Sequence, residues 1–168
     1  SAGSYGSTDG TGTAARFRTP RGITTDGTNL YVADSSNHKI RKIVIATGAV
    51  TTLAGSGQAG STDGTGTSAK FNYPWGLTTD GSNIYVVDQS NHKIRKIVIS
   101  TGVVTTIAGS GSSGSTDASG TSATFNSPTD ITTDGTNLYV ADNINHKIRK
   151  IVISTGVVTT LAGSGSSG

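Results

Sequence analysis

The sequence has no cysteine, no methionine and no glutamate, and only three prolines among its 168 residues. The absence of cysteine excludes a disulfide framework and any metal site built on thiolates. There is no run of 18 apolar residues, so no segment is predicted to cross a membrane as a helix. No secretory signal peptide is visible, and because the first residue is not methionine we expect an excerpt or a processed chain. The sequence carries no indication of cellular location.

Charge is organised by repetition. All ten acidic residues are aspartates; nine of them recur at a spacing of 54 residues, and so do nine of the thirteen basic residues. The two recurring sets cancel, so the net charge of +3 comes from five residues that do not recur. These five charges are Arg16, Arg18, Arg21, Lys70 and Asp130.

One segment is written three times with few changes. The stretch "NLYVADSSNHKIRKIVIATGAVTTLAG", which begins at Asn29, returns at Asn83 and again at Asn137. Internal repeats of roughly this length are typical of solenoids, propellers and arrays. We divide the chain into repeats at approximately 1–54, 55–108 and 109–162, and residues 163–168 copy the start of a further unit. We expect 1–168 to form a single domain.

Each unit predicts four short strands, which in the first unit cover residues 22–26, 30–34, 39–45 and 50–54. An Asp-Gly pair separates the first two strands, and such a pair is a strong hairpin signal because glycine adopts positive φ without strain. No segment has helical periodicity. Four antiparallel strands joined by tight links form a propeller blade. The expected fold class is therefore all-β, with a four-stranded antiparallel meander per repeat and three blades per chain.

The stretch between two blades, such as residues 55–74, is longer than an ordinary loop. It contains a turn at 61–67 and one recurring aromatic residue, three positions before each proline. The recurring aromatics are Phe17, Phe71 and Phe125. We expect each of them to pin its loop between two blades.

These motifs resemble the NHL repeat. The segment "FNYPWGLTTDGSNIYVVDQSNHKIRKI" at 71–97 carries that family's aromatic residue, its Pro-x-Gly and its "YVxD" strand followed by Asn-His-Lys-Ile. All three units match this pattern, although the third has Asp130 in place of the glycine. The resemblance implies a six-bladed propeller. Family members include lyases or lactonases with metals in the central channel and proteins that bind RNA or proteins on one face, so the fold does not select a function.

Three blades would fill half of a six-bladed ring and leave two blade faces open. Propellers close with about 4–8 blades, and exposed faces of that size mark an interface or an aggregation hazard. We therefore expect a homodimer in which the third blade of each chain packs on the first blade of the other and closes the ring. The alternative is that the missing blades belong to a longer parent chain.

Differences between the copies gather on one rim of the expected blades. They fall at residues 16–22, 35–36 and 4–5 and at the equivalent positions of the other units. If this diversified rim binds a ligand, we expect the contacts to come from Trp75, Tyr73, Arg21, Arg18, Lys70 and Asp130. Arginine beside aromatic residues suits an anionic or planar ligand, such as RNA, a glycan or a protein segment. Drift in unconstrained loops is the alternative explanation.

The ionisable residues do not suggest a reaction centre. His38, His92 and His146 occupy the same position on successive blades, which places them too far apart to share a metal ion. The aspartate that ends the second strand, such as Asp34, is expected to accept backbone N–H groups or to pair with nearby cations. The "KIRK" strands are expected to form a solvated, salt-bridged flank.

We accordingly expect no catalytic residue, no cofactor and no metal, and hence no enzyme, because almost every ionisable group belongs to the repeated blade pattern. The function predicted from the sequence is a self-assembling β-propeller repeat module, whether a natural excerpt, a reconstruction or a design. The alternative is a binding module that uses the diversified rim.

Overall fold

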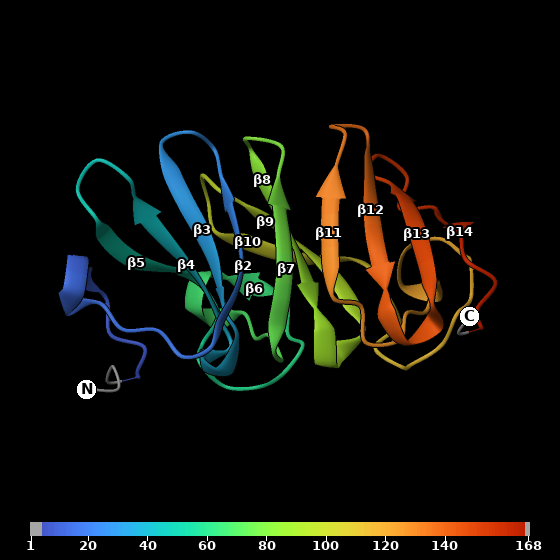
Figure 1. Cartoon of the computed structure of the whole chain (residues 1–168), viewed down its shortest axis with the longest axis horizontal. Coiled ribbons are helices and arrows are strands. Elements are labelled where there is room, and N and C mark those ends of the chain that lie inside the picture. Colours follow the sequence, from blue (N-terminus) through green and yellow to red (C-terminus); the bar gives the residue numbers. More distant parts are fainter. Residues whose placement is uncertain (1–4, 167–168) are drawn as a thin grey trace.

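The computed structural model describes residues 5–166, which form three antiparallel sheets placed side by side (Figure 1). The first sheet has the strand order β1-β5-β4-β3-β2, the second β6-β10-β9-β8-β7 and the third β11-β12-β13-β14. The strands of the first sheet are β1 (Gly10–Thr11), β2 (Pro20–Thr25), β3 (Asn29–Asp34), β4 (Lys39–Val44) and β5 (Ala49–Ala54). Those of the second are β6 (Gly64–Thr65), β7 (Pro74–Thr79), β8 (Asn83–Asp88), β9 (Lys93–Val98) and β10 (Val103–Ala108). Those of the third are β11 (Asp130–Thr133), β12 (Asn137–Asp142), β13 (Lys147–Val152) and β14 (Val158–Ala162).

The remaining elements are single turns of 3-10 helix. Three of them precede the inner strands, η1 (Gly12–Ala14), η3 (Gly66–Ser68) and η5 (Gly120–Ser122). The other three link the second and third main strands, η2 (Ser35–Asn37), η4 (Gln89–Asn91) and η6 (Asn143–Asn145). Within residues 5–166 no helix has the length and apolar character needed to cross a membrane.

The recurring hairpin turn is held by its aspartate. Asp26 Oδ1 accepts the backbone N–H groups of Thr28 and Asn29 at 2.9 and 2.6 Å, and Asp26 Oδ2 accepts the Tyr31 hydroxyl at 2.7 Å. Hydrogen bonds from Asn29 and from the Tyr31 hydroxyl hold the pKa of the Asp26 carboxyl well below its ordinary value. Asp80 and Asp134 make the same contacts in the other sheets. The predicted Asp-Gly hairpins are thus present in all three units.

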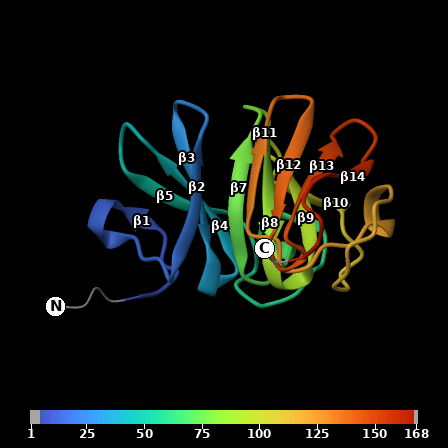
Figure 2. The same cartoon turned by 45° about the vertical axis from the view of Figure 1, so that its right-hand side comes forward.

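The three sheets are propeller blades, arranged like a fan with β2, β7 and β11 as neighbouring inner strands (Figure 2). The backbone N–H of Gly76 on β7 donates to the carbonyl of Thr129, next to β11, at 3.0 Å. The Asp-Gly hairpins lie together on one rim, and the η2, η4 and η6 turns lie on the opposite rim (Figure 1). The diversified rim predicted from the sequence is this second rim. One of its hydrogen bonds joins two of the varying segments, from Ser36 N–H to the Arg18 carbonyl at 3.2 Å.

The prediction of four strands per blade is incomplete. In the first two sheets a short fifth strand pairs with the outer edge, with Gly10 opposite Val50 and Thr65 opposite Val103. In the third sheet a single bridge stands at this position. The stretch that the sequence suggested to be a loop is held there by its recurring aspartate. Asp63, for example, accepts the backbone N–H and the hydroxyl of Thr106, both at 3.0 Å.

The hydrophobic core lies between blades rather than inside them. Phe71 and Phe125 are fully buried, as expected of residues that pin the loops. The first blade contributes four residues to the first cluster, Tyr31, Ala33, Ile40 and Ala54. The second blade contributes seven, Ala69, Phe71, Leu77, Ile84, Val86, Ile97 and Val104. The equivalent positions of blades two and three form the second cluster. Each blade therefore has one face that receives its successor and one face that inserts into its predecessor.

Candidate functional site

Each blade holds a buried ion pair behind its loop. In the second blade Arg95 Nη1 contacts Asp88 Oδ2 at 2.7 Å, and both side chains are fully buried. Arg95 Nη2 contacts Asp63 Oδ1, also at 2.7 Å, and the guanidinium carbon lies 5.1 Å from the centre of the Phe71 ring. Arg41 and Arg149 make the same contacts in the other blades. The prediction of a solvated flank is therefore wrong for the arginine of each "KIRK" strand, because the blade-to-blade loop folds over it.

The two aspartates of this ion pair also fix the backbone. Asp88 Oδ1 accepts the N–H of Asn72 at 2.7 Å, so the carboxylate ties the loop before β7 to the end of β8. Burial opposes the ionisation of Asp63, but hydrogen bonds from Thr106 and Arg95 outweigh it and lower the pKa of this carboxyl. The recurring aspartates and arginines therefore serve the fold of each blade.

The histidines join neighbouring blades. His38 Nδ1 accepts the backbone N–H of Tyr73 at 3.2 Å, and His92 Nδ1 accepts that of Ser127 at 3.0 Å. Burial, helped by the charge of Arg18, lowers the pKa of His38 and so favours the neutral ring that such an acceptor needs. Among residues 5–166 no group of three or more histidine and aspartate side chains is placed to hold a metal ion.

The first blade exposes positions that are buried in the other two. Ile23 is 60% exposed, whereas Leu77 and Ile131 at the same position are 5% exposed. Phe17 is partly exposed, although Phe71 and Phe125 are not exposed at all. We call this surface the leading face. Its apolar residues are Ala15, Phe17, Ile23, Leu30 and Ile43.

The third blade exposes the opposite set of positions. Ile148 is 41% exposed, whereas Ile40 and Ile94 are fully buried. We call this surface the trailing face. Its apolar residues are Tyr139, Ala141, Ile148, Leu161 and Ala162.

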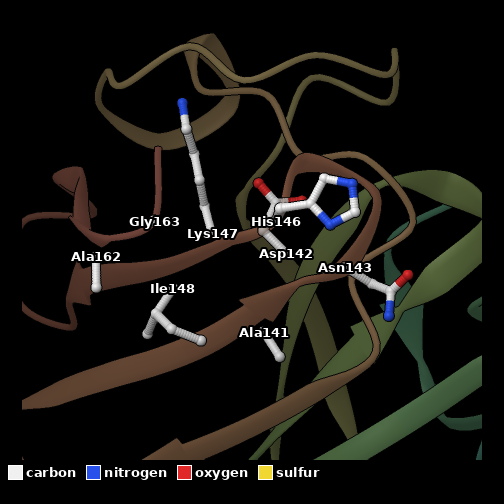
Figure 3. Close-up of a pocket in the computed structure, with 8 residues that line it drawn as sticks. All are labelled: Ala141, Asp142, Asn143, His146, Lys147, Ile148, Ala162 and Gly163. Atoms are coloured by element: carbon white, nitrogen blue, oxygen red, sulfur yellow. The ribbon is translucent and has the colours of Figure 1, made fainter. Parts of the chain in front are cut away.

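Two hollows of about 240 and 230 Å³ mark the trailing face. Figure 3 shows the first, in which the side chains of Ala141, Ile148 and Ala162 lie at one end and those of His146 and Lys147 at the other. Ala141 and Ile148 also line the second hollow. The equivalent positions of the first two blades are covered by the next blade.

A third hollow, of about 460 Å³, lies where the inner strands of the three blades begin. We call it the channel mouth, and it is lined by Arg21, Gly22, Trp75, Gly76, Thr129 and Asp130. The guanidinium carbon of Arg21 lies 4.1 Å from the centre of the Trp75 ring. Three residues that the sequence suggested for ligand binding, namely Arg21, Trp75 and Asp130, therefore meet in one hollow.

The other three suggested residues lie elsewhere. Arg18 stacks over Tyr5 with its guanidinium carbon 5.2 Å from the ring centre, and Tyr73 packs edge-on against His38 at 4.9 Å. Lys70 borders Gly60 in the loop before β7. None of Arg18, Lys70 and Tyr73 lines the channel mouth.

Comparison with known proteins decides the family. No family model matches the chain. NHL repeat-containing protein 2 of Homo sapiens is 38% identical over 144 residues, which make up 79% of this chain and 20% of that protein. The chain belongs to the NHL-repeat family. The NHL repeat-containing protein 2 of Gallus gallus is 35% identical over 144 residues, and this chain again spans only about a fifth of its length.

Solved structures agree with the propeller fold. A protein of unknown function from Bacteroides thetaiotaomicron is 32% identical with a TM-score of 0.62, over 78% of this chain and 32% of its own. Virginiamycin B lyase from Staphylococcus aureus is similar in fold alone, with 18% identity and a TM-score of 0.57 over 86% of this chain and 41% of its own. The three NHL blades therefore match part of larger propeller structures.

Proposed function

We propose that this NHL chain is a self-assembling half-propeller, two copies of which close a six-bladed ring, and that it has no catalytic activity. The observation that carries the proposal is the complementarity of its two open faces. The trailing face repeats the surface with which blades one and two receive the next blade. The leading face repeats the surface with which blades two and three insert.

The match extends to individual positions. On the trailing face, Tyr139, Ala141, Ile148 and Ala162 repeat the four residues that the first blade gives to the core. On the blade-one side, the seven positions that insert are filled by Ala15, Phe17, Ile23, Leu30, Val32, Ile43 and Val50. Away from the third residue of the Pro-x-Gly motif, the seam between two chains would thus repeat the apolar contacts of an interface that each chain already forms twice.

The polar link between blades can also recur at the seam. Thr19 has a φ of 53°, close to the 51° and 46° of Tyr73 and Ser127, whose backbone N–H groups bind histidine. Its N–H is therefore oriented for His146 of a second copy. When two chains pack head to tail, each open face is covered by the other chain, because two half-rings complete one ring. A closed ring has no free face to which further chains could add.

The recurring ionisable groups are already occupied by contacts that hold the fold, which favours a chain without catalytic activity. All nine recurring aspartates are used in hairpin turns or in the buried arginine network, as shown for Asp26, Asp63 and Asp88. A catalytic site needs ionisable groups that converge in one pocket and remain available to a substrate. The channel mouth offers only Arg21 and Asp130 as charged residues.

Replacing Ile148 with aspartate is expected to convert the dimer into folded monomers, because a charge at the centre of the trailing face loses its water when the seam closes. Light scattering should give the mass of two chains for the wild type and of one chain for Ile148→Asp. Thr105→Asp is the matched control, since Thr105 is exposed on the outer strand β10 and should leave the dimer intact. A wild type with the mass of one chain, or an Ile148→Asp variant that stays dimeric, would contradict the proposal.

A second candidate function is ligand binding at the channel mouth, which the stack of Arg21 on Trp75 favours. A guanidinium beside an indole suits a planar or anionic ligand. Trp75→Ala should abolish such binding with little loss of stability, because Arg21 and Thr129 occupy the equivalent positions. A screen of RNA, glycans and peptides, followed by thermal unfolding of the variant, checks both parts. Loss of the fold in Trp75→Ala, or a ligand indifferent to the change, would refute it.

A further inference from the structure

We propose that Asp130 is a seam residue whose carboxylate binds the guanidinium of Arg21 of a second copy across the interface that closes the ring. The inference rests on the proposed dimer and adds to it a contact that the internal interfaces lack. It assigns a role to Asp130, the one acidic residue outside the repeated pattern.

The position of Asp130 follows from how neighbouring inner strands meet. A Cβ atom at Gly22 would lie 2.5 Å from the carbonyl oxygen of Trp75 and 3.0 Å from the Cα of Gly76, on the next blade. A Cβ atom at Gly76 would lie 2.7 Å from the carbonyl oxygen of Thr129 and equally far from the Cα and the carboxylate Oδ1 of Asp130, one blade further. The third residue of each Pro-x-Gly motif thus packs on the second and third residues of the next motif.

The same relation between neighbouring motifs, applied to blade three, predicts the contacts at the seam between two chains. Asp130 is the third residue of the motif in blade three, so its neighbours across the seam are Arg21 and Gly22 of the second copy. Arg21 of blade one reaches the second residue of the next motif, Trp75, which shows that a long side chain at the mouth spans to an adjacent blade. Side chains at these positions are therefore within reach of adjacent blades.

Asp130 also changes the shape of the seam. Distances below 3 Å leave no room for a Cβ at Gly22 or Gly76, so the inner strands at the seam must stand further apart than those inside the chain. At this position the backbone of blade three differs from that of the other two blades. Thr129 N–H donates to the carbonyl of Ala141 in its own blade at 3.0 Å, and Asp130 pairs directly with Ala141. In the first two blades the strand register shifts at this place instead.

The first and third blades carry opposite charges at the channel mouth. Blade one has a cation at the mouth, Arg21, blade two has the neutral Trp75, and blade three has the anion Asp130. The Asp130 carboxylate accepts the N–H of Ile131 at 2.9 Å, and it takes part in none of the ion pairs formed within residues 5–166. Head-to-tail packing of two copies brings this anion beside the cation twice, once at each seam.

A charge-swap experiment tests the pair between chains. In Asp130→Arg dimers both seams would hold two cations, and in Arg21→Asp dimers both would hold two anions. A mixed dimer of one chain of each variant would hold an opposite-charge pair at both seams. We expect each variant alone to dissociate at least about tenfold more readily than the wild type, and the mixture to form heterodimers with an affinity close to that of the wild type.

Native mass spectrometry with one variant isotopically labelled identifies the heterodimer, and sedimentation velocity gives the dissociation constants. The milder Asp130→Asn variant should weaken the dimer less than Asp130→Arg and should remove part of its salt dependence. Arg18→Asp is the matched control for Arg21→Asp, because it makes the same charge reversal at an arginine that does not line the mouth. Variant dimers as tight as the wild type, or statistical mixing of the two variants, would overturn this inference and leave the ring intact. A wild type that is monomeric at every concentration would overturn the ring and this inference together.

Discussion

Replacing Arg95 with methionine is expected to lower the free energy of unfolding by about 3–5 kcal/mol, because it leaves the buried Asp88 carboxylate without its cation. Arg95 and Asp88 both have no exposed side-chain surface, so water cannot replace the lost partner. Methionine retains most of the apolar stem that packs near Phe71, which limits the loss of packing. The effect should therefore report mainly on the uncompensated charge.

Urea unfolding at one fixed chain concentration measures this change. Lys96→Met is the control, since Lys96 is the next residue of β9 but keeps partial exposure, and we expect a change within about 0.5 kcal/mol. The double variant Asp88→Asn with Arg95→Met should lose less than the sum of its single changes, because the two side chains act as a unit. Equal stability of Arg95→Met and Lys96→Met would show that the buried network does not support the blade.

Replacing Phe71 with alanine is expected to lower the free energy of unfolding by about 3–5 kcal/mol, the usual loss for a fully buried phenylalanine. Phe71 belongs to the first core cluster and is not exposed. The same substitution at Phe17 gives a matched comparison, because Phe17 occupies the equivalent position in blade one and lies on the leading face. Its loss should weaken the dimer rather than the single chain.

Denaturant unfolding combined with measurement of mass separates the two effects. Phe71→Ala should be less stable at every concentration, whereas Phe17→Ala should dissociate at concentrations at which the wild type remains a dimer. A loss below about 1 kcal/mol for Phe71→Ala would contradict the assignment of the core to the space between blades. A Phe17→Ala dimer as tight as the wild type would show that the leading face is not buried at the seam.

Local signals are what made the blades predictable from the sequence. The Asp-Gly turns are fixed by contacts within five residues, such as those of Asp26 with Asn29 and Tyr31. Expected strand 22–26 corresponds to Pro20–Thr25, and expected strand 30–34 to Asn29–Asp34. Errors of one or two residues at strand ends do not change the order of the blade.

Contacts between distant residues explain what the sequence did not reveal. Asp9 contacts Arg41 across 32 residues and Thr52 across 43, so neither the fifth strand nor the buried arginine leaves a local pattern. Each histidine link joins residues 35 positions apart and ends on a backbone N–H group. Because almost every residue has such a group, the sequence does not indicate which one the histidine binds. Exact recurrence of Asp, Arg and His was the available signal, but it did not specify the partners.

The sequence predicted only in part which candidate binding residues lie together, for a similar reason. Subtracting the repeated charges pointed to Arg21 and Asp130, which do share the channel mouth with Trp75. Tyr73 lies two residues before Trp75, yet its left-handed backbone, with a φ of 51°, places its ring against His38 instead. The direction of a loop side chain depends on the backbone conformation of its residue. The serines, asparagines and aromatic residues of this loop do not predict that conformation.

The most direct test of the ring is sedimentation equilibrium of the unmodified chain over a wide dilution series. If two half-propellers close one ring, we expect a single species with twice the chain mass of 16.9 kDa at high concentration, which dissociates to one chain on dilution without forming larger species. A mass of one chain throughout, or growth to three or more chains, would contradict the closure of a six-bladed ring by two copies.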